Sequence, residues 1–397
     1  MKLLVLIALI DVASAAVQFE ITKVASLRTR LKNSGLWTNH RKYKEVLRVQ
    51  NKPSNLATIH QPINGIYEFG YVANITIGTP GQPFVVYLDF LSANLWVPDK
   101  SCKTCQGVKM FDQTKSSTYV TNGQSLTIQD GGAIVNGFLG QDTITFVGTG
   151  ASLVVPKTVF GQATSVDSNT IGDSKTDPQF FDGYLGLAFQ SLAVDNVVPP
   201  LMNAINQGLF DNPYFTVYLQ GKGIDSDYAP RGVFTYGGLD TQNCGSLIAW
   251  QPFSSATYFQ FRMASIAVGS YSSSKGWDVI SDPGAAGIFG PQSITDAMAK
   301  AIGATYEADG DYQYYIIDCN ASPPPVKIGI GSNTYTVTNK QLKFDNGVSG
   351  QCYWEVAPYD FGGFGASWVL GSPFVVQYCN TYDLSGKRVG FSPANGA

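Results

Sequence analysis

From residue 71 onward, the chain alternates short runs of β-branched and aromatic residues with turns rich in Gly, Pro and Asn. Such runs are typical of β-strands, and the clearest span residues 71–77, 84–88, 138–146, 216–219 and 233–236. Helical periodicity is scarce, and its two best examples are residues 199–207 and 293–302. The pattern therefore predicts an all-β protein with a few short helices.

A weak internal repeat appears within this pattern. In each half of the body an apolar run leads into an acidic turn, residues 85–88 into Asp89 and residues 278–281 into Asp282. After a similar interval, each Asp is followed by two large residues and a glycine, Gly186 in one half and Gly371 in the other. Two related lobes, each offering one carboxylate at a turn, predict that the chemistry lies in a cleft between them.

Composition narrows the classes of protein that fit. The chain has 397 residues, of which 44% are hydrophobic and 14% charged, so it can bury a large core and is not disordered. A net charge of −3 without a basic patch argues against binding of nucleic acid. The only histidines are His40 and His60, so a chain that lost its N-terminal segment would have no histidine for a catalytic triad or a zinc site. Carboxylate chemistry remains, and we expect neither a cofactor nor a metal.

The N-terminus resembles a pair of processing segments. Lys2, an apolar run over residues 3–10 and the small residues 13–15 predict a signal peptide over residues 1–15. Residues 17–60 hold nine Lys or Arg and two Glu, a net charge of +7, which leaves −10 for residues 61–397. We interpret residues 16–60 as a basic propeptide held by charge on the acidic body, the alternative being a solvated basic arm. No later apolar run is long enough for a membrane anchor.

The chain has six cysteines, which are expected to pair in a secreted protein. Spacing alone leaves about fifteen connectivities. Cys102 and Cys105 are close enough to close one small loop. The same pair could also form a redox or zinc motif, although a second such pair is lacking.

Motifs spread over nearly the whole chain resemble those of the pepsin-like aspartic peptidases. They lie, in order, at residues 74–82, 94–98, 115–119, 137–143, 160–163, 182–187, 198–200, 236–240 and 368–371. So many motifs in order make the resemblance specific. It implies two β-lobes, over residues 61–235 and 236–397, with a peptide-binding cleft between them. It also implies that the basic leader is an inhibitory prosegment.

The resemblance carries two further implications. The disulfides it implies are Cys319–Cys352, Cys102–Cys105 and, as the remaining pair, Cys244–Cys379. It also places the catalytic pair at Asp89 and Asp282. In this family two facing carboxylates share one proton, so that one acts as a base toward water and the other as an acid toward the carbonyl.

The loops around both Asp residues depart from the family pattern. Phe90 and Pro283 stand where the family has threonines that bond across the lobe interface, and neither side chain has a hydroxyl. Leu91 replaces a glycine, whereas Gly284 keeps the equivalent one.

A second set of departures concerns hydroxyls that face the carboxylates and the substrate. Ser92 keeps the hydroxyl expected to bond Asp89, but Ala285 lacks its counterpart. Asp130 replaces the tyrosine of the flap that closes over substrate. Asp130, Ser92 and Gly284 are therefore the candidate substrate-binding residues, although Asp130 also fits a solvated turn.

Two hypotheses from different classes follow. One is a secreted aspartic endopeptidase, made as a zymogen and impaired by these losses. The other is a catalytically inactive relative that binds peptides or proteins in the same cleft. In both, the expected partners are a peptide or protein in the cleft and the chain's own propeptide, and we expect a monomer. The destination is extracellular, including the gut lumen, or lysosomal, and Asn74 and Asn320 begin glycosylation sequons.

Overall fold

A computed structural model describes residues 58–66, 70–105, 108–130, 133–167, 181–220, 230–309, 312–345, 349–359 and 366–397. The predicted signal peptide and the predicted propeptide up to residue 57 lie outside these residues. None of the described helices is long and apolar enough to cross a membrane.

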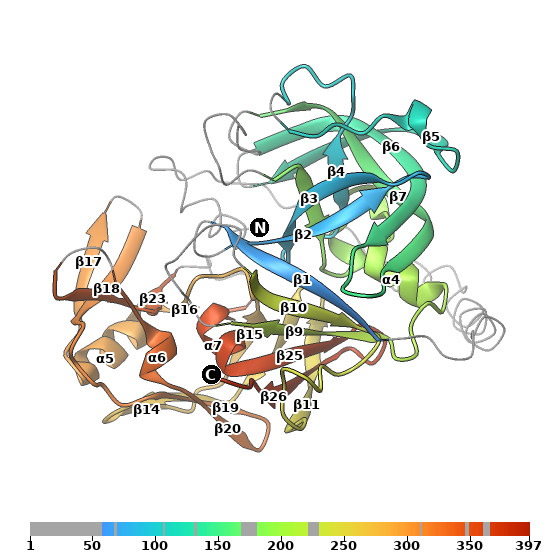
Figure 1. The fold of residues 1–397 in the computed structure, drawn as a ribbon. Helices are drawn as coiled ribbons and strands as arrows, with labels where there is room; N and C mark the ends of the chain where they lie inside the picture. Colours follow the sequence, from blue (N-terminus) through green and yellow to red (C-terminus); the bar gives the residue numbers. More distant parts are fainter. Residues whose placement is uncertain are drawn as a thin grey trace, which may run out of the picture.

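Six antiparallel strands form a central sheet that joins the two halves of the chain. Their order is β1 (Ile59–Ile66), β10 (Pro230–Tyr236), β9 (Tyr214–Leu219), β25 (Tyr378–Asp383), β26 (Arg388–Pro393) and β11 (Ala249–Ala256). Figure 1 shows these strands between the blue and green N-terminal lobe and the orange and red C-terminal lobe. Because β1 includes Ile59 and His60, the sheet begins just before the predicted propeptide boundary at residue 60, which stays a prediction.

The N-terminal lobe is a strongly twisted array of antiparallel and parallel strands. Its elements are β2 (Gly70–Ile77), β3 (Gln82–Asp89), β4 (Leu95–Pro98), β5 (Val120–Asp130), β6 (Ala133–Phe146), β7 (Leu153–Val166), β8 (Gly183–Gly186) and the helix α4 (Pro200–Asn206). Long β5, β6 and β7 form an antiparallel meander, whereas β3 pairs with β8 in parallel. This lobe ends in β9 and β10, which carry the chain into the central sheet.

The C-terminal lobe contains one group of strands next to the central sheet and two smaller sheets. The first group is β12 (Phe259–Met263), β15 (Trp277–Ser281), β16 (Ile288–Gly290), β23 (Val356–Pro358) and β24 (Trp368–Leu370). The small sheets are β14 (Tyr271–Ser273), β13 (Ser265–Val268), β19 (Val326–Ile330) and β20 (Asn333–Val337), and β17 (Thr305–Asp309), β18 (Tyr312–Asp318), β22 (Gln351–Trp354) and β21 (Lys343–Asp345). The helices are α5 (Gln292–Ile302), α6 (Asn339–Leu342) and α7 (Ser372–Gln377).

The same strand arrangement surrounds the acidic turn of each lobe. In the N-terminal lobe β8 lies between β3 and β4, and in the C-terminal lobe β24 lies between β15 and β16. The registers correspond, since Leu95 is opposite Leu185 in one lobe and Ile288 is opposite Leu370 in the other. The repeat in the sequence therefore corresponds to a repeated structural unit.

Close backbone contact explains the glycine that follows the two large residues in each repeat. A Cβ on Gly186 would lie 2.5 Å from the backbone nitrogen of Ala93, and one on Gly371 would overlap the carbonyl oxygens of Gly287 and Ala285. The amides of both glycines also bond the turn opposite, to Asn94 in one lobe and Gly287 in the other. These contacts fix the turns that carry the two Asp residues.

The predicted elements agree with the structure. Each of the five predicted strands lies within an observed strand, namely β2, β3, β6, β9 and β10, and the two predicted helices are α4 and α5. The three disulfides that the resemblance implied, Cys102–Cys105, Cys244–Cys379 and Cys319–Cys352, are all formed. The bilobal all-β prediction is confirmed.

Candidate active site

The two acidic turns place their carboxyl groups in the interior. Asp89 is the last residue of β3, and Asp282 directly follows β15. Asp89 is only 2% exposed and Asp282 only 1%. Such burial is exceptional for carboxylates unless they are paired or hydrogen-bonded. Each Asp therefore lies at the same point of its lobe's repeated unit.

Backbone amides hold both carboxyl groups in the same way. The amide of Leu91 donates to Oδ1 of Asp89 at 2.8 Å, and the amide of Gly284 donates to Oδ1 of Asp282 at 2.9 Å. In both loops the donor is two residues after the Asp. Pro283, which has no N–H, leaves this bond intact because the bond bypasses the residue next to the Asp.

Burial and mutual repulsion raise the pKa of Asp282. Removal of the carboxyl from water is the larger cause and the charge of Asp89 the second, and together they raise its pKa to about 7 against the opposing hydrogen bond from Gly284. Because Asp89 acts on Asp282 through its charge, the two groups titrate as a pair.

Asp89 has more nearby donors that favour its charged form than Asp282 has. Burial also raises its pKa, but three donors oppose the shift, first the Ser92 hydroxyl and then the amides of Leu91 and Ser92. Asp282 has one opposing donor, the Gly284 amide. More nearby donors lower the pKa of Asp89 than lower that of Asp282, so the arrangement favours the charge on Asp89 and the proton on Asp282.

Apolar side chains occupy the positions where the sequence lacks threonine and glycine. Phe90 is 1% exposed and packs in a cluster of aromatic rings, and Leu91 is 2% exposed. Leu91 belongs to a small apolar cluster with Ile280, Ala285, Ala366 and Val369. All four partners of Leu91 come from the C-terminal lobe, so residues next to Asp89 pack into the lobe that carries Asp282.

The flap position lies at the end of a hairpin. Asp130 is the last residue of β5 and pairs with Ala133 of β6. The side chain of Asp130 lies outside the described residues. Trp96, whose family counterpart bonds the flap tyrosine, stacks here on Tyr184 with ring centroids 5.3 Å apart.

Tyr87 is a site residue that the sequence reasoning missed. It lies two residues before Asp89 in β3, so the two side chains share a face of the strand. Its hydroxyl is buried without a hydrogen-bond partner among the described residues. Burial and the charges of Asp89 and Asp282 raise its pKa. The spacing of two residues from Asp89 could have identified Tyr87, because it places both side chains on one face of the strand. A tyrosine is also common in an apolar strand, so the residue did not stand out.

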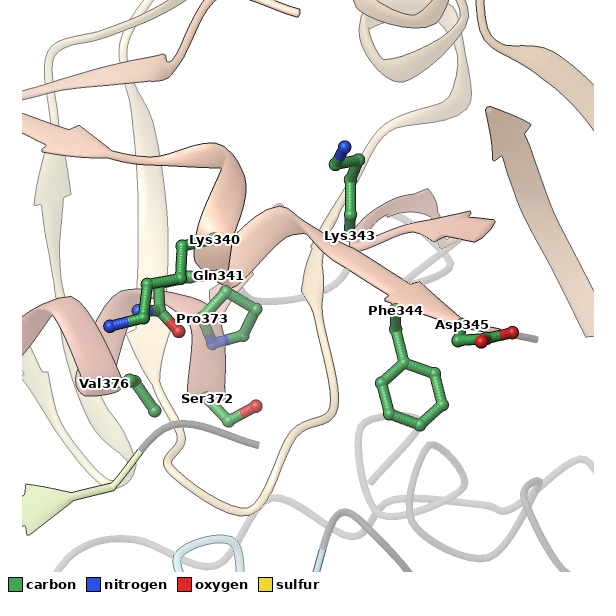
Figure 2. A pocket seen from close by; sticks show the side chains of 8 residues that line it. All are labelled: Lys340, Gln341, Lys343, Phe344, Asp345, Ser372, Pro373 and Val376. Carbon is green, nitrogen blue, oxygen red and sulfur yellow. The ribbon is translucent and has the colours of Figure 1, made fainter. Parts of the chain in front are cut away.

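A separate hollow lies behind the Asp282 loop rather than at the carboxylates. Figure 2 shows this pocket of about 130 Å³. Its lining comes from α6, β21 and α7, namely Lys340, Gln341, Lys343, Phe344, Asp345, Ser372, Pro373 and Val376. The Ser372 hydroxyl donates to the carbonyl of Ala286, which joins this wall to the turn after Asp282. Because neither Asp lines it, the pocket is not the catalytic site.

These observations define a two-lobed β protein with two coupled carboxyl groups, one from each lobe. The family model described as eukaryotic aspartyl protease matches residues 70–394. The chain is 49% identical to aspartic protease 6 and 38% identical to aspartic protease 1 of Caenorhabditis elegans, with 99% of both chains covered in each comparison. It is 31% identical to cathepsin E of Aquarana catesbeiana, over 99% of this chain and 97% of that one. The chain belongs to the pepsin-like family of aspartic peptidases.

Proposed function

We propose that the protein is an acid-favouring aspartic endopeptidase in which Asp89 and Asp282 hydrolyse peptide bonds. The observation that carries the proposal is the electrostatic coupling of two buried carboxyl groups at equivalent points of the two lobes. A pair that holds one proton has the two forms that general acid–base hydrolysis needs.

The hydrogen-bonding pattern assigns the two roles. Asp89, whose charged form is favoured by the nearby Ser92 hydroxyl and the amides of Leu91 and Ser92, is the ionised base that removes a proton from water as the water oxygen adds to the peptide carbonyl. Asp282 holds its proton at acid pH and donates it to the carbonyl oxygen. The resulting tetrahedral diol collapses as the C–N bond breaks, with one hydroxyl proton returning to a carboxylate and a second proton passing to the leaving amine.

We expect the rate to be low for this family. Loss of one preorganised donor can cost about 10²–10³ in rate, and a shift of about 1 Å in the reacting groups can cost about 10². Phe90, Pro283 and Ala285 all lack the hydroxyls that the family places there. Such losses are not additive, so the surviving pair retains residual catalysis.

The proposal extends to delivery and activation. Residues 1–15 act as a secretion signal, and the basic residues 16–60 cover the acidic body until low pH protonates its carboxylates and weakens the attraction. The peptide substrate then occupies the cleft between the lobes, with Asp130, Ser92 and Gly284 beside it. The destination is the extracellular space, the gut lumen or the lysosome.

Cleavage of an unfolded protein by the purified proform between about pH 3 and pH 7 tests the proposal. We expect cleavage that rises as the pH falls below about 7, where Asp282 holds its proton, that declines again where Asp89 becomes protonated, and that is lost in both Asp89→Asn and Asp282→Asn. Each Asn keeps an oxygen for the backbone donor, so both controls should stay folded. A folded wild type that cleaves nothing across this range contradicts the proposal.

The second candidate function is binding without catalysis. The apolar side chains of Phe90, Leu91 and Ala285 around the pair favour it, because each occupies a position that supports chemistry in the family. A panel of peptides binding equally to wild type and Asp89→Asn, with no cleavage of any of them, would select this function.

A further inference from the structure

Phe90 connects the Asp89 loop to three strands of the molecule. Its ring centroid lies 5.9 Å from that of Phe234 in β10, 5.8 Å from that of Phe259 in β12 and 5.7 Å from that of Tyr382 in β25. The first two contacts are edge-on, the geometry that aromatic pairs prefer. Phe90 is therefore held at the junction of the two lobes rather than inside one of them.

Tyr382 continues this connection toward the second carboxyl group. Its hydroxyl lies 2.7 Å from the hydroxyl of Ser281, which also accepts a hydrogen bond from Asn380 at 2.6 Å. Ser281 directly precedes Asp282, and the side chains of Tyr382, Ser281 and Asn380 are all buried. One side-chain path thus runs from the residue after Asp89, through the ring and hydroxyl of Tyr382, to the residue before Asp282.

A second contact crosses the lobes beside the first. The Leu91 side chain lies in one buried apolar cluster with Ile280, two residues before Asp282, and Ala285, three residues after it. The amide of the same Leu91 bonds the Asp89 carboxyl. A displacement of one lobe would therefore move the donor that orients Asp89.

We propose that the path Phe90–Tyr382–Ser281, with Leu91 beside it, fixes the Asp89 loop against the Asp282 loop in place of the missing threonine hydroxyls. Phe90, Tyr382 and Ser281 are positioning residues under this proposal. It rests on the proposed function for its catalytic consequence only, since the path itself is a structural link between the two carboxyl groups.

The magnitudes make the replacement adequate. Each aromatic pair stabilises the junction beyond the burial of its area, and a buried hydrogen bond contributes a comparable amount. Three ring contacts and one hydroxyl pair equal or exceed what two hydroxyl bonds supply. Among the described residues, the charges of the pair act on two tyrosines: those of Asp89 and Asp282 add to burial in raising the pKa of Tyr87, and that of Asp282 adds to burial in raising the pKa of Tyr382.

Tyr382→Phe is the sharpest test because it removes the hydroxyl and keeps the ring. Tyr236→Phe is its matched control, since Tyr236 is a fully buried tyrosine of the same sheet whose hydroxyl bonds Gln61 at 2.6 Å. Both changes remove one buried hydroxyl, but only the first interrupts the path to Asp282. Phe90→Leu is a second test that keeps an apolar side chain and removes the ring contacts.

Two readouts separate the path from the activity. The first is the titration of the Asp89 and Asp282 carboxyl carbons by NMR, which needs no turnover. We expect Tyr382→Phe to bring the two titration steps closer by about half a pH unit or more, and Tyr236→Phe to leave them unchanged. The second is steady-state kinetics, where Tyr382→Phe lowers kcat about tenfold or more with KM changed less than about twofold.

The outcomes are distinct. Equal titration curves for Tyr382→Phe, Phe90→Leu and wild type overturn the path, whether or not the enzyme is active. A wild type without turnover, whose titration steps still move in Tyr382→Phe but not in Tyr236→Phe, supports the path and rejects the proposed function.

Discussion

The unequal hydrogen bonding of the two carboxyl groups is the main residue-scale feature of the site. The hydroxyl that Ser92 supplies to Asp89 has no counterpart at Asp282, where the corresponding residue is Ala285. This missing hydroxyl, together with the Ser92 amide that favours only Asp89, separates the two groups into a base and an acid. Burial, with no such hydroxyl to oppose it, makes Asp282 costly to ionise in the folded protein.

Replacement of Asp282 by Asn should change how stability depends on pH. Because the folded-state pKa of Asp282 is raised to about 7, its contribution is fully present below the unfolded-state pKa near 4 and is lost as the pH rises to about 7. We expect the free energy of unfolding of the wild type to fall by a few kcal/mol across this window, and that of Asp282→Asn to fall much less. Denaturant titrations at pH 4, 5, 6 and 7 measure this difference.

Asp112→Asn is the control for this prediction. Hydrogen bonds from Lys100 and Thr114 lower the pKa of Asp112 to about 2, so its contribution is lost only as the pH falls toward 2. Asp112→Asn should keep the wild-type decline between pH 4 and pH 7. A decline equally steep in Asp282→Asn would show that other groups cause it.

At the scale of the element, the repeated unit of three strands sets the position of each carboxyl group. β8 ends in Gly186 and β24 is followed directly by Gly371, and these glycines bring the backbone against the opposite turn without a side chain between them. The Asp loops are consequently short and rigid, and their precision depends on two positions far from them in sequence.

Gly371→Ala should be strongly destabilising. The added Cβ would overlap the carbonyl oxygens of Gly287 and Ala285, which are backbone atoms and cannot turn aside as the end of a flexible side chain can. We expect a loss of about 3 kcal/mol or more in the free energy of unfolding, as is typical of overpacked sites, together with loss of activity. Thermal and denaturant unfolding measure the effect.

Gly245→Ala provides the matched control. Its Cβ would meet Pro393 at 3.5 Å, an ordinary van der Waals distance. The change should therefore alter stability by less than about 0.5 kcal/mol. Comparable losses in the two variants would contradict the argument from close contact.

Sequence reasoning succeeds for elements and fails for contacts between them. Alternation of apolar and turn residues located β2, β3, β6, β9 and β10, since strand propensity and turn chemistry are local. The motifs around Asp89 and Asp282 also pointed to the two turns whose carboxyl groups are buried and electrostatically coupled. The sequence could not show that Phe90 reaches Tyr382, because the partner of a core side chain is set by packing.

The buried polar contacts were equally hidden. Ser281 and Tyr382 are 101 positions apart, and neither is unusual within its strand. From the sequence, Phe90 could be interpreted only as the loss of a threonine hydroxyl. In the structure, its large side chain is buried at the junction of the two lobes. A substitution that removes one interaction can supply another, and only the folded packing shows which.

At the scale of the whole molecule, the two lobes share one hydrophobic core. A single apolar cluster includes Phe90 and Phe234 from the first half of the chain and Phe259 and Tyr382 from the second. The central sheet contributes strands from both halves, and the Cys244–Cys379 disulfide bridges 135 positions within the second. Local damage at the junction should therefore affect both lobes.

Phe259→Ala should test this shared core. Phe259 is fully buried, and its ring contacts those of Phe90, Phe189, Phe215, Phe253 and Tyr382. We expect a loss of about 3–5 kcal/mol in the free energy of unfolding. Hydrogen exchange followed by mass spectrometry should show faster exchange in β9 and β10 as well as in β12 and β25.

A surface control completes this experiment. Ile248→Ala removes a side chain that is 42% exposed, and its exchange should match the wild type. Acceleration in Phe259→Ala that is confined to the C-terminal lobe would mean that the lobes unfold independently.

The ring of Phe90 also restricts the mutational routes open to this chain. A threonine at position 90 would restore the family's hydroxyl but would leave a cavity among Phe234, Phe259 and Tyr382, and such cavities cost about 24 cal/mol per Å³. The single change Phe90→Thr would therefore lower the free energy of unfolding unless the neighbouring side chains changed with it. Position 90 and the rings around it can therefore change only together, so a stepwise series of single substitutions passes through less stable proteins.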